Sequence, residues 1–306
     1  MGFNGIAAAA GTWELGDLTV NRLGFGAMRL TGSAAFHLGA PRGREQSIAV
    51  LRRAVELGVN HIDTAAFYFS ALRSANELIN RALAPYPDGL VIVPKVGPRR
   101  DESGGWATWA TPEELRGQVE ENIRQLGVDH LDVVNLRVNR TGSIAEHFGA
   151  LADLRKEGLV RHLGVSNVSV KQLAEAQDIA PVVCVQNRYG IDTRPADSEE
   201  VLRVCGEQGI AFVPFFAIAG EGREQGAPAT HDAAVTEIAR AHGATPAQVR
   251  LAWTLHQGPH VLAIPGTGDP AHLEQNVAAA ALRLSAADLT RLSSLPSGDP
   301  QRLPRP

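Results

Sequence analysis

Three side chains in the first third of the chain are of types that together transfer protons: Asp63, Tyr68 and Lys95. A buried lysine beside a tyrosine stabilises the phenolate, and an aspartate beside that lysine keeps the ammonium charged and oriented. Such a tyrosine is predicted to act as a general acid or base near neutral pH. The alternative is a structural Asp–Lys ion pair with a tyrosine on the surface, because structural pairs also perturb pKa values.

A fourth candidate, Arg137, lies near the end of "DVVNLRV" (132–138), a run whose other residues are mostly those of a buried strand. A guanidinium is costly there unless it has something to bind. Arg137 could orient a carbonyl group and stabilise a developing oxyanion, lower the pKa of Tyr68, or bind an anionic substrate group in a bidentate manner. The alternative is an inward salt bridge to Asp63 or another acid, without substrate contact.

The elements that must position these residues are short apolar runs alternating with amphipathic runs. The apolar runs are continuous and mostly β-branched or aromatic, as is typical of parallel strands covered on both faces. The expected strands span 22–28, 61–65, 90–96, 131–136, 162–167, 182–187, 211–216 and 261–266. The expected helices span 43–58, 74–84, 111–127, 144–158, 169–177, 197–209, 232–242 and 245–257. The third of these helices is expected to have Thr111 as its N-cap, Pro112 at its first position and Glu114 three residues after the cap.

This alternation over 306 residues predicts a (β/α)₈ TIM barrel. A doubly wound sheet is the alternative, but "GFGAM" (24–28) leads into a long connection and not into a glycine-rich phosphate loop. Residues 11–24 predict an N-terminal β-hairpin with Gly16 and Asp17 at its turn. We expect residues 1–306 to form a single domain, with a core of about 12–292 and a loose C-terminal tail.

Polar residues stand at the carboxyl ends of most of the expected strands. In a barrel of this kind the chemistry lies at that end, so these side chains predict a polar cavity at one mouth. The residues are Asp63, Lys95, Asn135, Arg137, Ser166, Asn167, Gln186 and Asn187.

Composition excludes several other classes of function. The formal net charge of −4 gives no general attraction to nucleic acid or an anionic membrane. Neither a signal peptide nor an apolar run of membrane-spanning length is recognisable, so we expect a cytoplasmic protein. The two cysteines, Cys184 and Cys205, are interpreted as small buried hydrophobes in preference to a disulfide or a metal pair. No metal site is expected.

Together these residues resemble the aldo-keto reductase superfamily over about residues 12–292. The motifs that carry the resemblance are "GFGAM", "GVNHIDTAAFY", "VPKVG", "LGVDHLDVVNL", "LRKEGLVRHLGVSN", "VQNRYG" and "IPGTGDPAHLEQN". Each is weak alone, but their order and spacing are specific. Within the superfamily, "DVVNLRV", "VCVQN" and "VPFF" look most like the bacterial pyridoxal reductase (pyridoxine 4-dehydrogenase) branch.

The resemblance implies a barrel that binds NADP(H), or in some members NAD(H), and transfers hydride reversibly between the nicotinamide and a carbonyl carbon. The family's catalytic tetrad is Asp, Tyr, Lys and His. Asp63, Tyr68 and Lys95 match the first three, and Arg137 takes the place of the histidine. Tyr68 is then expected to give the proton to the carbonyl oxygen.

The same matching implies a set of cofactor-binding residues. Ser166, Asn167 and Gln186 are expected to hold the nicotinamide carboxamide, and Asn276 the adenine. Phe215 is expected to stack on the nicotinamide ring, although without the family pattern it would be interpreted as barrel core. The remaining expected cofactor contacts are Gly26, Met28, Gly266, Thr267 and His272.

This chain departs from the family pattern around the tyrosine and after the last strand. Phe69 follows Tyr68 where relatives often have glycine, and it could narrow the substrate pocket. The last-strand loop has no Lys or Arg for the 2′-phosphate of NADP(H); Asp269 would repel a phosphate and only His272 could attract one. NAD(H) is therefore an alternative cofactor.

The loop 97–113 carries Trp106 and Trp109, which are expected either to form the aromatic wall of a mobile substrate loop or to anchor the loop to the barrel. We expect an enzyme that acts on a small aldehyde, ketone or alcohol. The alternative is a cofactor-bound regulatory subunit with little turnover, as among the potassium-channel β-subunits of the superfamily.

Overall fold

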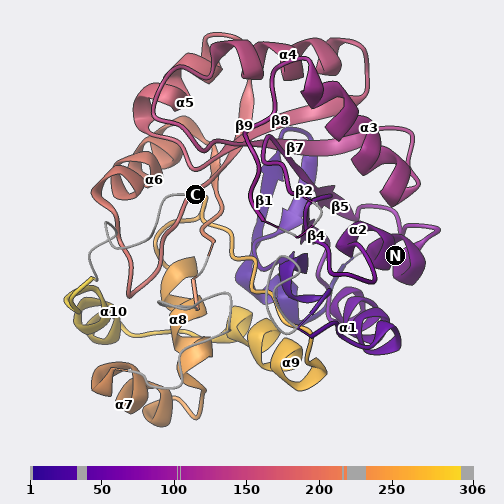
Figure 1. Ribbon diagram of the computed structural model, residues 1–306. Helices are drawn as coiled ribbons and strands as arrows, with labels where there is room; N and C mark the ends of the chain where they lie inside the picture. The colour runs from indigo at the N-terminus through magenta and orange to yellow at the C-terminus, as the bar shows by residue number, and fades with distance from the viewer. Residues whose placement is uncertain are drawn as a thin grey trace.

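A computed structural model describes residues 3–32, 40–101, 103, 105–215, 217–218 and 232–297. Its parallel strands follow one another around a central barrel in chain order, and the helices lie outside them (Figure 1). The strands are β1 (Thr12–Leu15), β2 (Leu18–Asn21), β3 (Phe25–Gly26), β4 (His61–Asp63), β5 (Val91–Val93), β6 (Lys95–Val96), β7 (Leu131–Arg137), β8 (Val160–Ser166), β9 (Val182–Gln186) and β10 (Ala211–Phe212). The predicted (β/α)₈ barrel is confirmed.

Regular strand pairing around the barrel is interrupted at two places. β5 and β6 flank Pro94, which has no N–H to donate, but its carbonyl accepts from the amide of Asn135 at 3.0 Å. At the seam, Phe212 pairs with Val261, and Leu23 pairs with Ala263, both in parallel. The predicted strand 261–266 is therefore reduced to isolated bridges within 261–263, and the predicted strand 22–28 to Phe25–Gly26 with a 3₁₀ turn after it. Residue 216 of the predicted strand 211–216 and residues 298–306 of the tail lie outside the described residues.

Each of the eight predicted helices has a counterpart, and two further helices, α9 and α10, were not predicted. The helices are α1 (Arg44–Glu56), α2 (Ala75–Leu83), α3 (Glu114–Leu126), α4 (Ala145–Lys156), α5 (Val170–Gln177), α6 (Ala196–Gln208), α7 (Ala233–Ala241), α8 (Pro246–Leu255), α9 (Pro270–Ala278) and α10 (Ala286–Ser293), with 3₁₀ turns η1 (Ile6–Ala10), η2 (Ala27–Arg29) and η4 (Ala279–Ala281). Ser74, Ser169 and Thr245 close capping boxes at the starts of α2, α5 and α8.

The start of α3 differs from the prediction. The helix begins at Glu114 with Glu113 as its N-cap, and Pro112 lies in the turn before it. The expected side-chain pairing still forms, since the amide of Thr111 donates to Glu114 Oε2 at 2.9 Å and the amide of Glu114 donates to Thr111 Oγ1 at 3.4 Å. The capping pattern was thus identified correctly, but the regular helix starts later.

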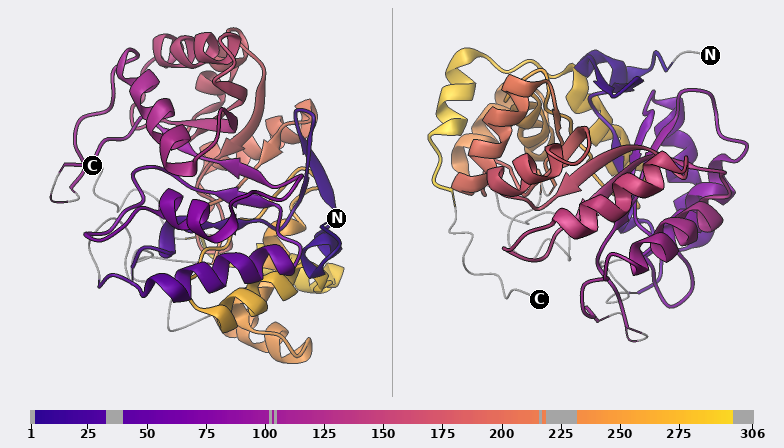
Figure 2. Two further views of the ribbon diagram at one scale, coloured as in Figure 1. Left: turned by 90° about the vertical axis from the view of Figure 1, so that its right-hand side faces the viewer. Right: turned by 90° about the horizontal axis from the view of Figure 1, so that it is seen from above.

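The N-terminal hairpin, β1 and β2, closes the end of the barrel at which the strands begin (Figure 2). Its turn is as predicted: Gly16 has φ of 70°, a left-handed conformation that glycine adopts without strain. Leu15 and Val20 are fully buried against the strand residues that fill the barrel interior. The carboxylate of Asp17 accepts hydrogen bonds from Arg161 and His162 on β8, which fixes the turn to the barrel.

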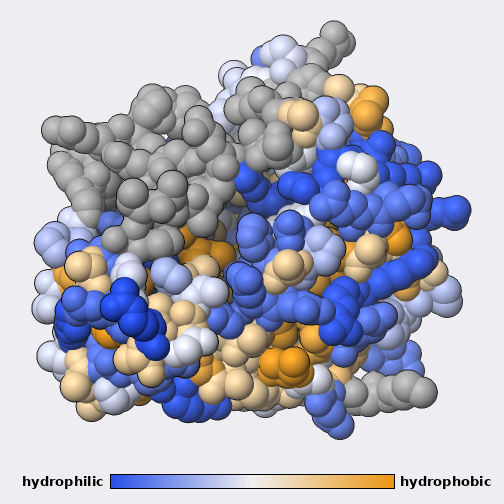
Figure 3. Space-filling view, turned by 90° about the horizontal axis from the view of Figure 1, so that it is seen from below, coloured by the Kyte–Doolittle hydropathy of each residue, from blue (hydrophilic) through white to orange (hydrophobic). Residues whose placement is uncertain are grey.

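The outer surface is that of amphipathic helices packed on a barrel. Seen from below, hydrophilic residues are interspersed with smaller hydrophobic areas (Figure 3). None of the helices in the described part of the chain is both long and apolar enough to cross a membrane. Cys184 and Cys205 are buried free thiols, as expected from the sequence.

Candidate active site

An ion pair between Lys95 and Asp63 lies inside the barrel at the end of β4. Lys95 Nζ donates to both carboxylate oxygens of Asp63 at 2.6 Å, and to the carbonyl of Thr64 at 3.3 Å. Gln186 Nε2, from the end of β9, donates to Asp63 Oδ2 at 2.6 Å. Both charged side chains are buried. Burial alone would lower the pKa of Lys95, but Asp63 and Tyr68 raise it above its ordinary value, so Lys95 carries its proton.

Tyr68 lies beside this ion pair, in the loop that follows β4. Its side chain is buried, and Lys95 Nζ is 5.1 Å from the centre of its ring. Burial raises the pKa of Tyr68, and the nearby charge of Asp63 also raises it, while the charges of Lys95 and Arg137 and a hydrogen bond with Lys95 lower it. The net direction is upward. Lys95 therefore lowers the pKa of Tyr68, as the sequence predicted, but desolvation of the buried ring outweighs the ammonium.

Arg137 is the uppermost of three inward-facing residues on β7. Strand residues alternate between faces, so Val133, Asn135 and Arg137 lie in one row from the barrel interior to its mouth. Arg137 Nη1 donates to Ser166 Oγ at 3.3 Å, and Arg137 Cζ lies 4.9 Å from the ring centroid of Phe215. Asp63, one of its predicted alternative partners, is instead paired with Lys95.

On the opposite side of the mouth two glycines bring backbone segments into close contact. A Cβ at Gly26 would lie 2.7 Å from the carbonyl oxygen of Ile264, and a Cβ at Gly266 would lie 2.5 Å from that of Gly26. Side chains are thus excluded where β3 and the last-strand loop meet. Met28 is half-buried in the turn after β3, and Thr267 is buried in the loop.

Comparison with known proteins identifies this arrangement. Residues 22–296 match the model of the Aldo/keto reductase family. The chain belongs to the aldo/keto reductase family. Pyridoxine 4-dehydrogenase of Escherichia coli is 45% identical over 94% of this chain and 99% of its own. An aldo-keto reductase of Klebsiella pneumoniae in complex with NADPH has a TM-score of 0.74 and 28% identity, with 94% of each chain covered. Another structure from that organism, in complex with NADP and acetate, has a TM-score of 0.73 and 28% identity over 94% of this chain and 95% of its own.

Membership of the aldo/keto reductase family confirms the predicted enzyme class, and the two complexes support NADP(H) as its cofactor. The residues expected to hold the nicotinamide end suit that group. Gln186 is fully buried, and its Oε1 has no hydrogen-bond partner among the described residues, so it can accept from a carboxamide. Ser166 is fully buried at the end of β8. Asn167 has φ of 65° and donates one side-chain N–H from Nδ2 to the carbonyl of Val138 at 2.9 Å, which orients its amide and leaves a second N–H.

The residues expected at the adenosine end lie on or before α9. Asn276 is buried and His272 is exposed. Asp269, which was expected to repel a phosphate, is the N-cap of α9 and accepts from the amides of Ala271 and His272 at 2.8 and 3.1 Å.

The two loop tryptophans of this aldo/keto reductase have different environments. Trp109 stacks on His147 with ring centroids 3.9 Å apart, and its Nε1 donates to the carbonyl of Arg137 at 2.9 Å. These contacts favour the anchoring interpretation for Trp109. Trp106 is 43% exposed, with Arg100 Cζ 3.2 Å from its ring centroid, which leaves a substrate role open to it.

A cavity of about 350 Å³ lies between the loop after β4 and α3. Its walls include Phe67, Phe69, Lys95, Arg99 and Gln118, so it reaches Lys95 from the α3 side. Tyr68 and Arg137 are not among its lining residues. The cavity therefore lies beside the Asp63–Lys95–Tyr68 cluster, and Phe69 forms part of its wall.

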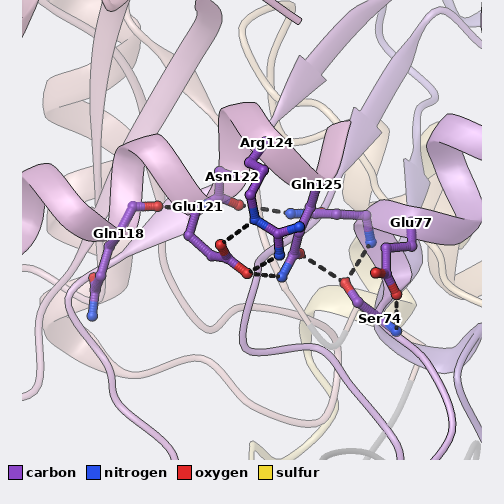
Figure 4. A network of polar contacts seen from close by, with 8 residues as sticks. Ser74, Glu77, Gln118, Glu121, Asn122, Arg124 and Gln125 are labelled. Atoms are coloured by element: carbon purple, nitrogen blue, oxygen red, sulfur yellow. Dashed lines mark hydrogen bonds and ion pairs between the residues drawn. The ribbon is translucent and has the colours of Figure 1, made fainter. Parts of the chain in front are cut away.

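Sequence reasoning missed a buried polar network behind Lys95, part of which joins α2 to α3 in Figure 4. Thr64 Oγ1 donates to Asn76 Oδ1 at 2.7 Å, and Asn76 Nδ2 donates to Asn122 Oδ1 at 2.8 Å. All three side chains are fully buried. The carbonyl of Thr64 accepts a hydrogen bond from Lys95 Nζ. The network therefore holds in place a residue that binds the Lys95 ammonium.

Gln118 extends the network to the strand that carries Lys95. Asn122 Nδ2 donates to the carbonyl of Gln118 at 2.8 Å. Gln118 Oε1 accepts from the amide of Gly97 at 2.6 Å, and its Nε2 donates to the carbonyl of Pro98 at 3.2 Å. A sequence signal did exist: Asn122 interrupts an apolar helical stripe whose other buried members are Leu115, Val119 and Leu126.

Proposed function

We propose that this aldo/keto reductase uses Tyr68 as the general acid for reduction of an aldehyde or ketone, and as the general base for the reverse oxidation. The observation that carries the proposal is the burial of Tyr68 against Lys95, which Asp63 holds in place through two 2.6 Å hydrogen bonds. NADPH, when bound, supplies the hydride for the carbonyl carbon. The chain supplies the proton and the orientation of the reactants.

The upward direction of the pKa of Tyr68 determines which form of its hydroxyl is present at neutral pH. A phenol with a raised pKa is protonated at neutral pH, so Tyr68 has its proton ready for the carbonyl oxygen. After transfer, Lys95 stands next to the phenolate and stabilises it. Arg137, at the same mouth, would donate to the oxygen as negative charge develops there.

The cofactor is proposed to lie across the mouth from β8 and β9 to α9. Gln186, Ser166 and Asn167 would hold the nicotinamide carboxamide, and Phe215 would stack on the ring. The strand-end glycines let β3 and the last-strand loop, both of which would contact the cofactor, pack against each other. The further proposed contacts are Gly26, Met28, Gly266, Thr267, His272 and Asn276.

For the substrate we propose a small carbonyl compound, with pyridoxal and pyridoxine as the first pair to test, since the E. coli relative is named for pyridoxine. The loops after β4 and β6 carry aromatic residues, among them Phe69 and Trp106, which suit a flat ring. We also propose a cytoplasmic location, which suits a chain whose two thiols are unpaired.

The test is a steady-state panel of aldehydes, ketones and alcohols, including pyridoxal and pyridoxine, with NADPH, NADH and their oxidised forms. The matched variant is Tyr68→Phe, which removes only the hydroxyl. We expect Tyr68→Phe to lower kcat by about 10²–10⁴-fold, the usual contribution of a general acid, with the NADPH dissociation constant unchanged. Undiminished turnover in Tyr68→Phe would refute the assignment. A single slow turnover with retained cofactor in the wild type would instead favour a regulatory subunit.

A further inference from the structure

The last-strand loop lacks the basic side chain that a 2′-phosphate needs, but the fold brings one from the other end of the chain. Arg42 precedes α1 and lies directly against Gly268. A Cβ at Gly268 would lie 2.6 Å from Cδ of Arg42, and closer still to its Nε and Cζ. Gly268 is therefore the residue that leaves space for this guanidinium.

The position of Arg42 is fixed by contacts on several sides. Its amide donates to the carbonyl of Thr31 at 3.2 Å, and its own carbonyl accepts from Arg73 Nη1 at 3.2 Å. Gln46, in the first turn of α1, donates from Nε2 to the carbonyl of Gly268 at 2.8 Å. The start of α1 and the last-strand loop are thus joined, and the backbone that carries Arg42 is held next to residues 266–269.

No acid in the described part of the chain forms an ion pair with Arg42. Counting only residues that the structure describes, its Nε has no hydrogen-bond partner and its guanidinium is in no ion pair. Asp269 is close enough for the charge of Arg42 to act on it, and its carboxylate is used as the N-cap of α9. The pKa of Asp269 is lowered by the amides of His272 and Ala271 and, to a smaller extent, by the charges of His272 and Arg42. Arg42 therefore offsets the negative charge that the sequence placed in this loop.

We propose that Arg42 binds the 2′-phosphate of NADP(H) and thereby sets the preference of this enzyme for NADP(H) over NAD(H). The inference rests on the cofactor placement proposed above, with Thr267 and Asn276 at the adenosine end. A guanidinium suits a phosphate because it offers several donors and a fixed positive charge. NADH has a hydroxyl at the 2′ position, so it gains little from this contact, and the arginine acts on selectivity and not on hydride transfer.

The experiment measures dissociation constants of NADPH and NADH by fluorescence titration of the wild type and of Arg42→Met, without any substrate. We expect Arg42→Met to weaken NADPH binding about tenfold or more and to leave NADH binding within about twofold, because one charge-assisted contact is lost. Arg42→Lys should recover part of the difference, since it keeps the charge. Arg81→Met is the matched control, because Arg81 is exposed in the last turn of α2, at the far end of the barrel, and should change neither constant.

Two results would overturn the inference while leaving the proposed function intact. One is that neither the NADPH constant nor the NADH constant changes in Arg42→Met. The other is an equal loss for both nucleotides, which would show that Arg42 supports the loop structure only. A wild type that binds neither nucleotide would instead reject the proposed function itself. Because the readout is binding, loss of turnover for other reasons does not affect the conclusion.

Discussion

The guanidinium of Arg137 lies 4.9 Å from the ring centroid of Phe215, so the charge that interrupts a buried strand rests on an aromatic face. The same guanidinium donates to Ser166 Oγ. Both contacts are residues expected to bind the nicotinamide. Arg137 thus supports the proposed cofactor platform while its charge lowers the pKa of Tyr68. A histidine, which the family resemblance led us to expect at this position, would titrate near neutral pH, whereas arginine keeps its charge.

Replacing Arg137 with methionine should separate these two effects. Methionine keeps an extended side chain against Phe215 but removes the charge. We expect Arg137→Met to lower kcat about tenfold or more, to change the NADPH dissociation constant less, and to move the apparent pKa of the catalytic acid upward in the pH–rate profile. Arg137→Lys, which keeps a cation, should leave that apparent pKa closer to the wild-type value. Unchanged turnover, or equal loss of turnover and binding, would exclude a catalytic role.

The Asp63–Lys95 ion pair should be far more sensitive to loss of one partner than to loss of both. Lys95→Met leaves a buried carboxylate that still accepts from Gln186 but has lost its cation, and we expect a cost of about 3–5 kcal/mol in the free energy of unfolding. The double variant Asp63→Asn with Lys95→Met should recover part of this stability, since the buried charge is gone, while both proteins lose turnover. Urea denaturation measures the difference. Equal destabilisation in the two would show that the charges are not coupled.

Much of the site was predictable because it follows the strand order. In a parallel barrel the carboxyl ends of all strands meet at one mouth, so Asp63, Arg137 and Gln186 could be grouped from their positions alone. Their roles were expected from the family pattern. The sequence predicted Gln186 only as a cofactor contact. Its hydrogen bond to Asp63 is evident only in the structure.

What could not be predicted depends on packing between segments distant in sequence. The direction of the pKa of Tyr68 follows from how deeply the ring is buried, which spacing does not reveal. Arg42 and Gly268 meet because α1 packs beside α9, and α9 itself was not predicted. The sequence predicted Asn76 as part of a helix but gave no indication that its side-chain amide is buried and hydrogen-bonded.

The buried amide pair of Asn76 and Asn122 provides a test of the network behind Lys95. Asn122→Leu leaves Asn76 Nδ2 without its acceptor, which should cost about 1–3 kcal/mol in the free energy of unfolding. The double variant Asn76→Leu with Asn122→Leu should cost less than the sum of the single changes, because Asn76 Nδ2 and Asn122 Oδ1, each of which one single change leaves unsatisfied, are then both absent. As positioning residues they should also affect kcat more than the NADPH dissociation constant. Additive costs with unaltered kcat would show that the pair has no such role.

A buried histidine should make the stability of this barrel depend on pH. His61, the first residue of β4, is buried with no partner for Nδ1 among the described residues, and its ring lies against Gly24. Burial lowers the pKa of His61 from 6.5 to about 4; the charge of Asp63 opposes this shift and that of Lys95 adds to it. Between these two pKa values, His61 binds a proton in the unfolded chain but not in the folded protein. The contribution of neutral His61 to the free energy of unfolding is fully present above pH 6.5. It is lost as the pH falls towards 4, and the total loss is about 3 kcal/mol.

The measurement compares urea denaturation at pH 7.5 and pH 4.5 for the wild type and for His61→Gln, which cannot take up a proton. Other groups also change charge over this interval, so the share of His61 is the difference between the two proteins. We expect His61→Gln to lose about 2–3 kcal/mol less than the wild type on acidification. His130→Gln, at an exposed position before β7, is the control and should lose as much as the wild type. An identical loss in His61→Gln and the wild type would mean that His61 does not remain neutral in the folded barrel.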